Sequence, residues 1–262
     1  MTEKKNKKLS TDKIINFYDV IPKKYTQEPE NPNFNEHGIK IPFRMCIVAP
    51  SGSGKTNFLL NILKVFSQGK GTFLSVDIIT ANKDEPLYNY LTTEYEGFSV
   101  KEKLVNTPIL DEFDKQYNHL VVWDDLVLSK NQAVIEEYYL RARKQNVSVI
   151  YLSQSYYDIP KFIRKNSNYL VLLDLNGSKR EQTAILNEAA TNLNKETLNA
   201  IYQDAVSVPL RPLIITLGKV DLNKKYRKGW KDYYNMKEWH REPERKTKSK
   251  SKKQLDSESE SE

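Results

Sequence analysis

The sequence lacks cysteine pairs, long apolar runs and internal repeats. Its 262 residues include a single cysteine, Cys46, so no intramolecular disulfide can form, which fits a reducing compartment. No apolar stretch reaches the length of about 20 residues that spans a bilayer. The polar start, Met1–Lys8, is not followed by the hydrophobic region of a secretory signal. We therefore expect a soluble, intracellular protein without a membrane-spanning segment.

Acidic residues are fewer than basic ones. Lys and Arg number 41 against 34 Asp and Glu, which gives a formal net charge of +7. Much of this excess lies in the two terminal segments, so the charge permits a polyanionic partner without requiring one. The hydrophobic fraction of 39% and the charged fraction of 29% suit one large domain with polar ends.

Composition divides the chain into three parts. Residues 1–41 form a polar, Pro-rich arm, with one short ordered piece expected around Ile14–Tyr18. Residues 42–220 alternate apolar strands with amphipathic helices. Residues 221–262 form a basic, aromatic extension that ends in a low-complexity charged tail, Ser257–Glu262, which we expect to be disordered.

The pattern in residues 42–220 predicts an α/β fold. The expected strands are Phe43–Val48, Phe73–Thr80, Leu120–Trp123, Ser148–Leu152, Tyr169–Leu175 and Leu213–Leu217. The expected helices are Lys55–Phe66, Glu85–Tyr95, Ile109–Tyr117, Asn131–Lys144, Glu181–Glu188 and Lys195–Ala205, with a further short one in Ile159–Asn166. Strands that alternate with helices predict a mainly parallel central sheet flanked by helices, with ligands at the carboxyl ends of its strands.

A glycine-rich loop joins the first expected strand to the first expected helix. It is the segment Ala49-Pro50-Ser51-Gly52-Ser53-Gly54-Lys55-Thr56. Between a strand and a helix, such a loop predicts a phosphate-binding P-loop, whose backbone N–H groups surround the β-phosphate. Lys55 would contact the β- and γ-phosphates, and the Thr56 hydroxyl would hold Mg²⁺. Ala49 stands where this motif usually has its first glycine, which constrains the loop entry. We expect ATP and Mg²⁺ as ligands.

Two acids follow the strand Leu120–Trp123. A carboxylate at this strand end, beside the phosphate loop, suits Mg²⁺, and we assign that role to Asp124. Asp125 is then placed to orient or deprotonate the attacking water. Glutamate is the common residue for that role, so the shorter aspartate must lie closer or act through water. The intervening strand Phe73–Thr80 indicates a P-loop NTPase of the additional-strand type.

Candidate catalytic residues also follow in the next helix and strand. In the helix Asn131–Lys144, we expect Val134, Tyr138 and Ala142 to face inward. Arg141 and Arg143 are two positions apart and face opposite sides, so only one of them can serve a given site. Both arginines can equally well be solvated.

Gln154 follows the strand Ser148–Leu152. Its amide can contact both the γ-phosphate and the attacking water, and so sense which nucleotide is bound. A polar residue at a strand end is also common without such a role.

The order and spacing of these segments resemble the poxvirus-type genome-packaging ATPases. These belong to the FtsK/HerA superfamily and occur in large DNA viruses, virophages and polinton-like elements. The resemblance rests on Ala49–Thr56, on Val121-Val122-Trp123-Asp124-Asp125, on Arg141–Gln154 and on Ile159–Asn166. It covers about Phe43 to Leu175, and Lys144 departs from it where relatives commonly have histidine.

The resemblance implies an ATP hydrolase that drives double-stranded DNA into a preformed capsid. It implies a homo-oligomeric ring, a hexamer or pentamer, capsid proteins as further partners and no membrane. Arg143 matches an arginine finger that reaches a neighbouring subunit's nucleotide, Gln154 matches a sensor, and Arg164 matches an arginine of unassigned role. The implied location is the host-cell cytoplasm or virus factory, with virion association as an alternative.

Other classes of protein also use a Gly-Lys-Thr loop. A small-molecule or nucleoside kinase needs an arginine-rich lid, and the only basic pair after the last nucleotide motif is Lys179-Arg180. A regulatory nucleotide switch would not need the acids Asp124 and Asp125 together with Gln154. A cellular or plasmid DNA-transfer ATPase is generally longer and often membrane-anchored.

Overall fold

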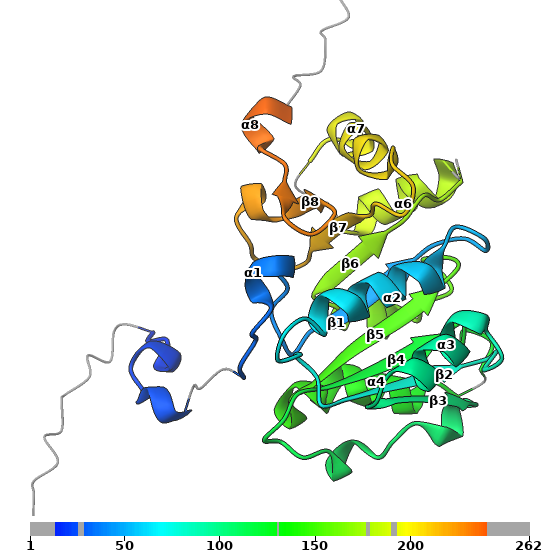
Figure 1. Cartoon of the computed structure of the whole chain (residues 1–262). Coiled ribbons are helices and arrows are strands. Elements are labelled where there is room, and N and C mark those ends of the chain that lie inside the picture. Colours follow the sequence, from blue (N-terminus) through cyan, green and yellow to red (C-terminus); the bar gives the residue numbers. More distant parts are fainter. Residues whose placement is uncertain (1–13, 26–28, 130, 177–178, 190–192, 240–262) are drawn as a thin grey trace, which may run out of the picture.

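The structure is a computed structural model whose described residues build one nine-stranded sheet with helices on both faces (Figure 1). It describes residues 14–25, 29–129, 131–176, 179–189 and 193–239. The strands are β1 (Arg44–Val48), β2 (Ser75–Thr80), β3 (Phe98–Glu102), β4 (His119–Asp124), β5 (Val147–Ser153), β6 (Tyr169–Leu172), β7 (Leu213–Thr216), β8 (Tyr226–Lys228) and β9 (Asp232–Tyr233). The helices are α1 (Phe34–His37), α2 (Lys55–Phe66), α3 (Pro86–Glu94), α4 (Ala133–Arg141), α5 (Lys161–Asn166), α6 (Lys179–Ala189), α7 (Lys195–Val206) and α8 (Met236–Trp239). Short 3₁₀ turns are η1 (Phe17–Asp19), η2 (Lys23–Tyr25), η3 (Leu104–Asn106), η4 (Leu110–Glu112), η5 (Ala142–Gln145) and η6 (Leu222–Lys224).

The sheet order is β3-β2-β4-β5-β1-β6-β7-β8-β9, and its first six strands are parallel. This confirms the predicted α/β fold. The strand that lies between β1 and β4 is β5, whereas β2, the expected strand Phe73–Thr80, pairs with β4 on its other side. The pairing aligns the strand ends, since Val48 lies opposite Ser153 and Asp124 lies opposite Leu152. The loops that follow β1, β4 and β5 therefore emerge side by side.

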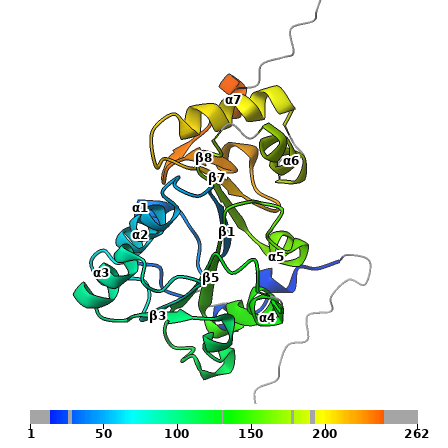
Figure 2. The ribbon, with the colours of Figure 1, turned by 90° about the vertical axis from the view of Figure 1, so that its right-hand side faces the viewer.

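Each face of the sheet is covered by its own group of helices, which Figure 2 shows edge-on. On one face, α2 and α3 pack over a cluster that includes Phe43, Ile62 and Tyr88. On the other, α4 to α7 pack over a cluster that includes Trp123 and Tyr139. Because both faces are covered, β4 and β5 are buried at every position, which explains their nearly continuous apolar sequence.

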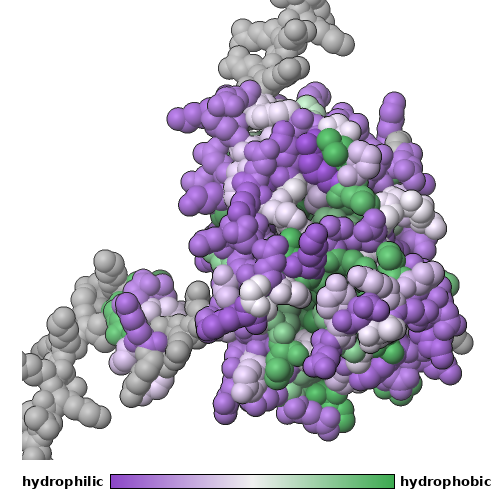
Figure 3. All heavy atoms as spheres, viewed as in Figure 1, coloured by the Kyte–Doolittle hydropathy of each residue, from purple (hydrophilic) through white to green (hydrophobic). Residues whose placement is uncertain are grey.

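The outer surface is mostly hydrophilic on the face shown in Figure 3, with hydrophobic side chains exposed in narrow strips between the elements. None of the helices in the described residues is long and apolar enough to cross a bilayer. The expected disordered tail, Ser257–Glu262, lies outside the described residues, as does the start of the N-terminal arm.

One expected helix, Ile109–Tyr117, is wrong. The structure has only the 3₁₀ turn η4 there, and Phe113 is extended at its end. The Asp114 carboxylate accepts a hydrogen bond from the backbone N–H of Gln116 at 2.9 Å. Such local bonds offer the backbone an alternative to helix, which is why aspartate favours turns.

The inward face of α4 differs by one position from the expected one. Tyr138 and Ala142 are buried as predicted, but Val134 is 38% exposed and Ile135 is fully buried instead. The prediction extended one helical stripe over the whole segment. In the structure α4 ends at Arg141 and continues as the tighter turn η5, which changes the faces that its residues present.

Three strands had no counterpart in the sequence prediction. β3 pairs with β2 at one edge of the sheet, and its five residues are only half-buried. At the other edge, β8 and β9 continue the sheet beyond β7 in the antiparallel sense. Residues 226–228 and 232–233 of the expected basic extension thus lie in the sheet. The division of the chain at residues 41 and 220 stays a prediction.

A buried arginine connects the segment before β1 to the segment after β7. Arg227 in β8 is fully buried, and its Nη1 donates hydrogen bonds to the carbonyl oxygens of His37 (2.9 Å) and Trp230 (3.0 Å) and to the hydroxyl of Tyr233 (3.0 Å). Trp230 in turn stacks on Phe58 of α2, with ring centroids 5.7 Å apart. The two ends of the folded part are therefore fixed to the helix that follows the P-loop.

His37 gives this contact a pH dependence. Its ring lies 4.0 Å from that of Phe66, and burial together with the charge of Arg227 lowers the His37 pKa from 6.5 to about 4, against an opposing effect of Glu36. The folded protein keeps His37 neutral, whereas the unfolded chain takes up the proton below its own pKa of about 6.5. This contribution to the free energy of unfolding is complete above pH 6.5 and is lost as the pH falls towards 4.

We predict that His37→Asn removes this pH dependence. Urea unfolding gives the free energy of unfolding of both proteins at pH 7 and at pH 4.5. The amount by which the wild-type value exceeds that of the variant should be about 2 kcal/mol smaller at pH 4.5. Taking the difference cancels the titration of all other groups. A difference that does not change with pH contradicts the prediction.

Candidate functional site

The P-loop bends at its glycines. Gly52 and Gly54 have φ values of 76° and 84°, in the left-handed region that favours glycine, whereas Ala49 does not. Alanine at the loop entry therefore causes no backbone strain. The Ser53 hydroxyl donates to the Pro50 carbonyl oxygen at 2.6 Å and closes the loop, and α2 begins directly after Gly54.

A second loop lies against this one. A Cβ built on Gly54 would lie 2.3 Å from Leu210 Cδ2, so the loop between α7 and β7 contacts the P-loop where Gly54 has no side chain. Leu210 has φ 61°, a left-handed conformation that costs a non-glycine residue about 1 kcal/mol or more. Arg211 fixes the loop by donating to the Ala205 carbonyl oxygen (2.7 Å) and the Ser207 hydroxyl (2.9 Å). No motif in the sequence indicates this wall of the site.

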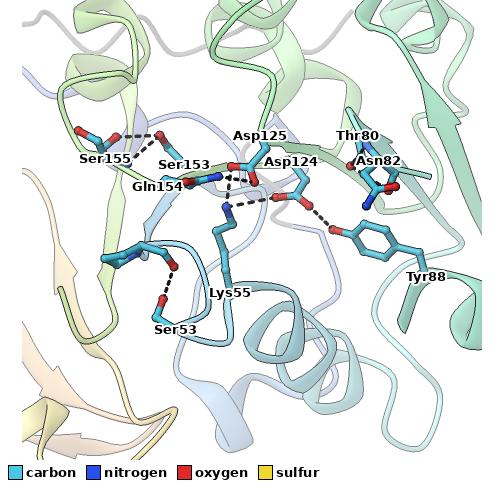
Figure 4. A network of polar contacts seen from close by, with 11 residues as sticks. Ser53, Lys55, Thr80, Asn82, Tyr88, Asp124, Asp125, Ser153, Gln154 and Ser155 are labelled. Atoms are coloured by element: carbon cyan, nitrogen blue, oxygen red, sulfur yellow. Dashed lines mark hydrogen bonds and ion pairs between the residues drawn. The ribbon is translucent and has the colours of Figure 1, made fainter. Parts of the chain in front are cut away.

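Lys55 lies between Asp124, the last residue of β4, and Asp125, which follows it (Figure 4). Its Nζ is 2.6 Å from Asp125 Oδ1 and 3.9 Å from Asp124 Oδ1. Gln154 Nε2 donates to the other oxygen of Asp125 at 3.1 Å. The structure therefore brings together four of the predicted site residues from three separate loops. Asp125 has φ 54°, and this left-handed turn directs its carboxylate back toward the P-loop.

Asp124 lies deeper and has a partner that the sequence analysis missed. The Tyr88 hydroxyl donates to Asp124 Oδ2 at 2.7 Å, and Tyr88 itself is fully buried. Burial raises the pKa of Asp124, while Tyr88 and Lys55 lower it. Burial and the Asp124 charge raise the pKa of Tyr88, and a contact with the Thr56 hydroxyl acts in the opposite direction. Thr56, Tyr88 and Asp124 thus meet at one point.

These residues fit a Mg²⁺ ion bound together with a triphosphate. Asp124 Oδ1 is buried and accepts no hydrogen bond, so an oxygen with unused lone pairs lies beside Lys55. Within the described residues there is no group of three or more His, Cys, Asp and Glu side chains that could hold a metal by itself. Mg²⁺ commonly takes one or two protein oxygens and completes its shell with phosphates and water. The pair Thr56 and Asp124 matches that mode.

Arg143 does not lie in this site. It is exposed in η5, which precedes β5, whereas the P-loop and the acids lie beyond the carboxyl ends of their strands. Its charge acts instead on Arg44, the first residue of β1, and together with burial lowers the Arg44 pKa. Within one subunit Arg143 therefore does not reach the nucleotide that its own P-loop would hold.

Arg164 has a structural role. Its Nη1 donates to the carbonyl oxygens of Tyr156 (3.3 Å) and Ile159 (2.7 Å), and its guanidinium lies 4.8 Å from the centre of the Tyr156 ring. Its Nε pairs with Glu188 at 3.3 Å. These contacts fix the loop that follows Gln154.

Comparison with known proteins identifies the family. The sequence pattern of the poxvirus A32 protein family matches residues 32–215. The chain belongs to the poxvirus A32 protein family. This A32-family protein is 26% identical to the DNA packaging protein OPG160 of variola virus over 203 residues, which cover 68% of this chain and 75% of that protein. It is 26% identical to OPG160 of vaccinia virus (strain Copenhagen) over 197 residues, covering 65% and 73%.

Solved structures share the fold of this A32-family protein. The genome packaging NTPase B204 from Sulfolobus turreted icosahedral virus 2, in complex with AMP, has a TM-score of 0.53 at 13% identity, over 73% of this chain and 98% of that one. Its sulfate complex has a TM-score of 0.50 at 13% identity, over 73% and 97%. This likeness extends to the mainly parallel central sheet with flanking helices.

We predict that Tyr88→Phe weakens metal binding and leaves the fold intact. The ring stays buried, but Asp124 loses a hydrogen bond that orients it, and such supporting bonds are commonly worth 10- to 100-fold in metal affinity. Binding of a fluorescent ATP analogue, titrated with Mg²⁺, should need about tenfold more Mg²⁺ for half-saturation. Tyr90→Phe, an exposed tyrosine of the same helix, is the matched control. Equal Mg²⁺ requirements in both variants contradict the assigned role.

Proposed function

We propose that this A32-family protein is an ATP-driven motor that moves double-stranded viral DNA into preformed capsids. The observation that carries the proposal is the position of Lys55 between the two acids and beside Gln154. An inert nucleotide-binding protein has no need for this arrangement. Relatives named DNA packaging proteins support DNA as the substrate that is moved.

The P-loop and its helix would bind the triphosphate. Backbone N–H groups from Ser51 to Thr56 would surround the phosphates, and the N-terminus of α2 favours negative charge. Thr56 and Asp124 would hold Mg²⁺, which supplies charge neutralisation on the phosphates when bound. Tyr88 keeps the Asp124 carboxylate oriented.

The pairing of Lys55 with Asp125 corresponds to the site before a nucleotide binds. A triphosphate offers Lys55 stronger anionic partners than one carboxylate. Once Lys55 turns to the phosphates, Asp125 is free to accept a proton from the attacking water. Gln154 holds the second oxygen of Asp125 and lies where the γ-phosphate would be sensed. Nucleotide binding would in this way create the catalytic base.

A ring explains why Arg143 lies away from its own site. An arginine that completes a neighbour's site stabilises charge in the transition state only after assembly, and it links hydrolysis to movement between subunits. We therefore propose a homo-oligomeric ring, a hexamer or pentamer, that contacts DNA and capsid proteins in the host-cell cytoplasm or virus factory.

A nucleoside kinase is the main competing function. It predicts a phosphorylated acceptor as product, whereas the proposed motor releases inorganic phosphate and works faster with linear double-stranded DNA. Measuring both products with the purified protein separates the two functions.

We predict that Asp125→Asn retains ATP binding but hydrolyses ATP at least 100-fold more slowly. Asparagine keeps the shape and can still bond to Gln154, but it cannot accept the proton. Asp125→Glu should keep part of the activity, because glutamate is the common residue in this role. Hydrolysis by Asp125→Asn at the wild-type rate contradicts the assignment of the base.

We further predict that Lys55→Ala and Arg143→Ala are each inactive and that their mixture is partly active. In a mixed ring, a subunit with intact Lys55 can lie beside one with intact Arg143, which at equal amounts restores about a quarter of the sites. Phosphate release with linear DNA present measures this recovery.

Arg141→Ala is the control for these variants, since Arg141 is also exposed but pairs with Asp111 at 3.0 Å within its own chain. It should behave as wild type. If Arg143→Ala is fully active alone, or if mixing restores nothing, the shared site is wrong.

A further inference from the structure

A polar groove lies at the amino ends of the central strands, whereas the P-loop lies at their carboxyl ends. It has a volume of about 980 Å³ and is lined among others by Arg44, Lys165, Asn168, Lys219 and Lys225. Arg44 begins β1 and Asn168 precedes β6, while Lys219 follows β7, which runs antiparallel to β6. The groove therefore opens at the amino ends of β1 and β6, about 15 Å along β1 from the P-loop. Figure 2 shows α5 and α6 on the face of the sheet next to it.

The positive charge in this groove is not compensated. The ion pairs found among the described residues include none made by Arg44, Lys165, Lys219 or Lys225. The one carboxylate that lines the groove, Glu188, pairs with Arg164 and so neutralises only that arginine. Arg44 Nη1 donates to the Tyr139 carbonyl oxygen at 3.0 Å, but none of the four cations has a carboxylate partner in the described residues. Arg143 extends the positive charge beside Arg44.

Lys225 makes the strongest case for an anionic ligand. It is only 5% exposed, and burial lowers its pKa. Its ammonium lies 5.6 Å from the centre of the Tyr226 ring, with no carboxylate or hydrogen-bond acceptor recorded for it in the described chain. The stem of Lys225 thus packs into the fold while its ammonium faces the groove without a carboxylate partner in the described residues, and this arrangement suits an anion from outside.

The arrangement of the cations favours an extended polyanion over a single phosphate group. A compact phosphate site converges backbone N–H groups at a helix N-terminus or glycine loop. Here the nearest helix, α5, presents its C-terminal turn, and the charges are long side chains from three separate elements. Such spread contacts suit the backbone of duplex DNA, which carries one charge about every 1.7 Å.

We infer that this groove binds the phosphate backbone of double-stranded DNA, in contacts that do not depend on base sequence. The inference rests on the proposed function and adds to it the surface through which the motor holds its substrate. The nucleotide site and the DNA contact would then lie at opposite ends of the same central strands.

The test is DNA binding by a triple variant, Lys165→Gln, Lys219→Gln and Lys225→Met. Anisotropy of a labelled 30-base-pair duplex, measured over a range of salt concentrations, should show affinity reduced at least tenfold and the salt slope reduced by about 3. Lys161→Gln with Lys224→Gln is a two-charge control, because both are exposed lysines outside the lining, Lys161 one helical turn before Lys165 and Lys224 directly before Lys225. Arg143 is left intact because its predicted role at a neighbour's nucleotide would confuse the result.

The outcomes separate the two proposals. The groove is supported as the DNA contact if the wild type binds DNA and the triple variant does not. The variant should also keep the wild-type rate of hydrolysis without DNA and the wild-type circular dichroism spectrum. Binding by the triple variant equal to that of the control overturns the groove while leaving the motor intact. If the triple variant keeps its affinity for DNA but loses hydrolysis in the absence of DNA, the cations contact a neighbour's ATP. That result would overturn the assignment of the groove to DNA. Absence of DNA binding by wild type overturns both proposals.

Discussion

The contact of Lys55 with the two acids after β4 is the constraint on which the site depends. A lysine that is only 8% exposed needs negative partners, and the alignment of β1, β4 and β5 supplies them from loops 70 residues apart in the chain. Asp125 stays paired with Lys55 until a stronger anion takes its place as the partner of this lysine. Its geometry depends on register, since a slip of one residue would turn these side chains to the other face of the sheet.

Much of the molecule supports that register. The helices on the two faces bury β4 and β5 completely, and α3 places Tyr88 against Asp124 from the flank. Arg227 joins the segment before β1 to the turn after β8, and Trp230 of that turn stacks on Phe58 of α2. The phosphate loop is therefore held from the helix that follows it, from the strand that precedes it and from the Leu210 loop beside it.

The sequence predicted the parts of the site that belong to continuous motifs. The P-loop, the two acids and Gln154 each follow an apolar strand, and all three strand positions agree with the structure within a few residues. Tyr88 and Leu210 were beyond prediction because their roles arise from contacts across long sequence separations. Tyr88 is an ordinary helical tyrosine until β2 is known to lie next to β4. The missing helix at Ile109–Tyr117 shows the opposite error, where local turn chemistry at Asp114 overrides an apparent helical pattern.

The nucleotide site lies at the carboxyl ends of the central strands and the basic groove at their amino ends. Any coupling between the two sites must therefore pass along the strands or through the loops that join them. The loop after β5 begins with Gln154 at the nucleotide edge and is held further along by Arg164, through the carbonyl oxygens of Tyr156 and Ile159. Arg164 also lines the basic groove, where it pairs with Glu188. One side chain thus touches both the segment that leaves the nucleotide site and the surface assigned to DNA.

Strand β1 offers a second connection, but its buried backbone pairs with β5 and β6 along its length and resists displacement. The loop has other anchors besides Arg164, since the Tyr156 N–H donates to the Glu181 carboxylate at 2.6 Å and Ile159 is fully buried. Arg164 and the loop that it holds, rather than the strands of the sheet, therefore form the side-chain connection between the nucleotide site and the basic groove.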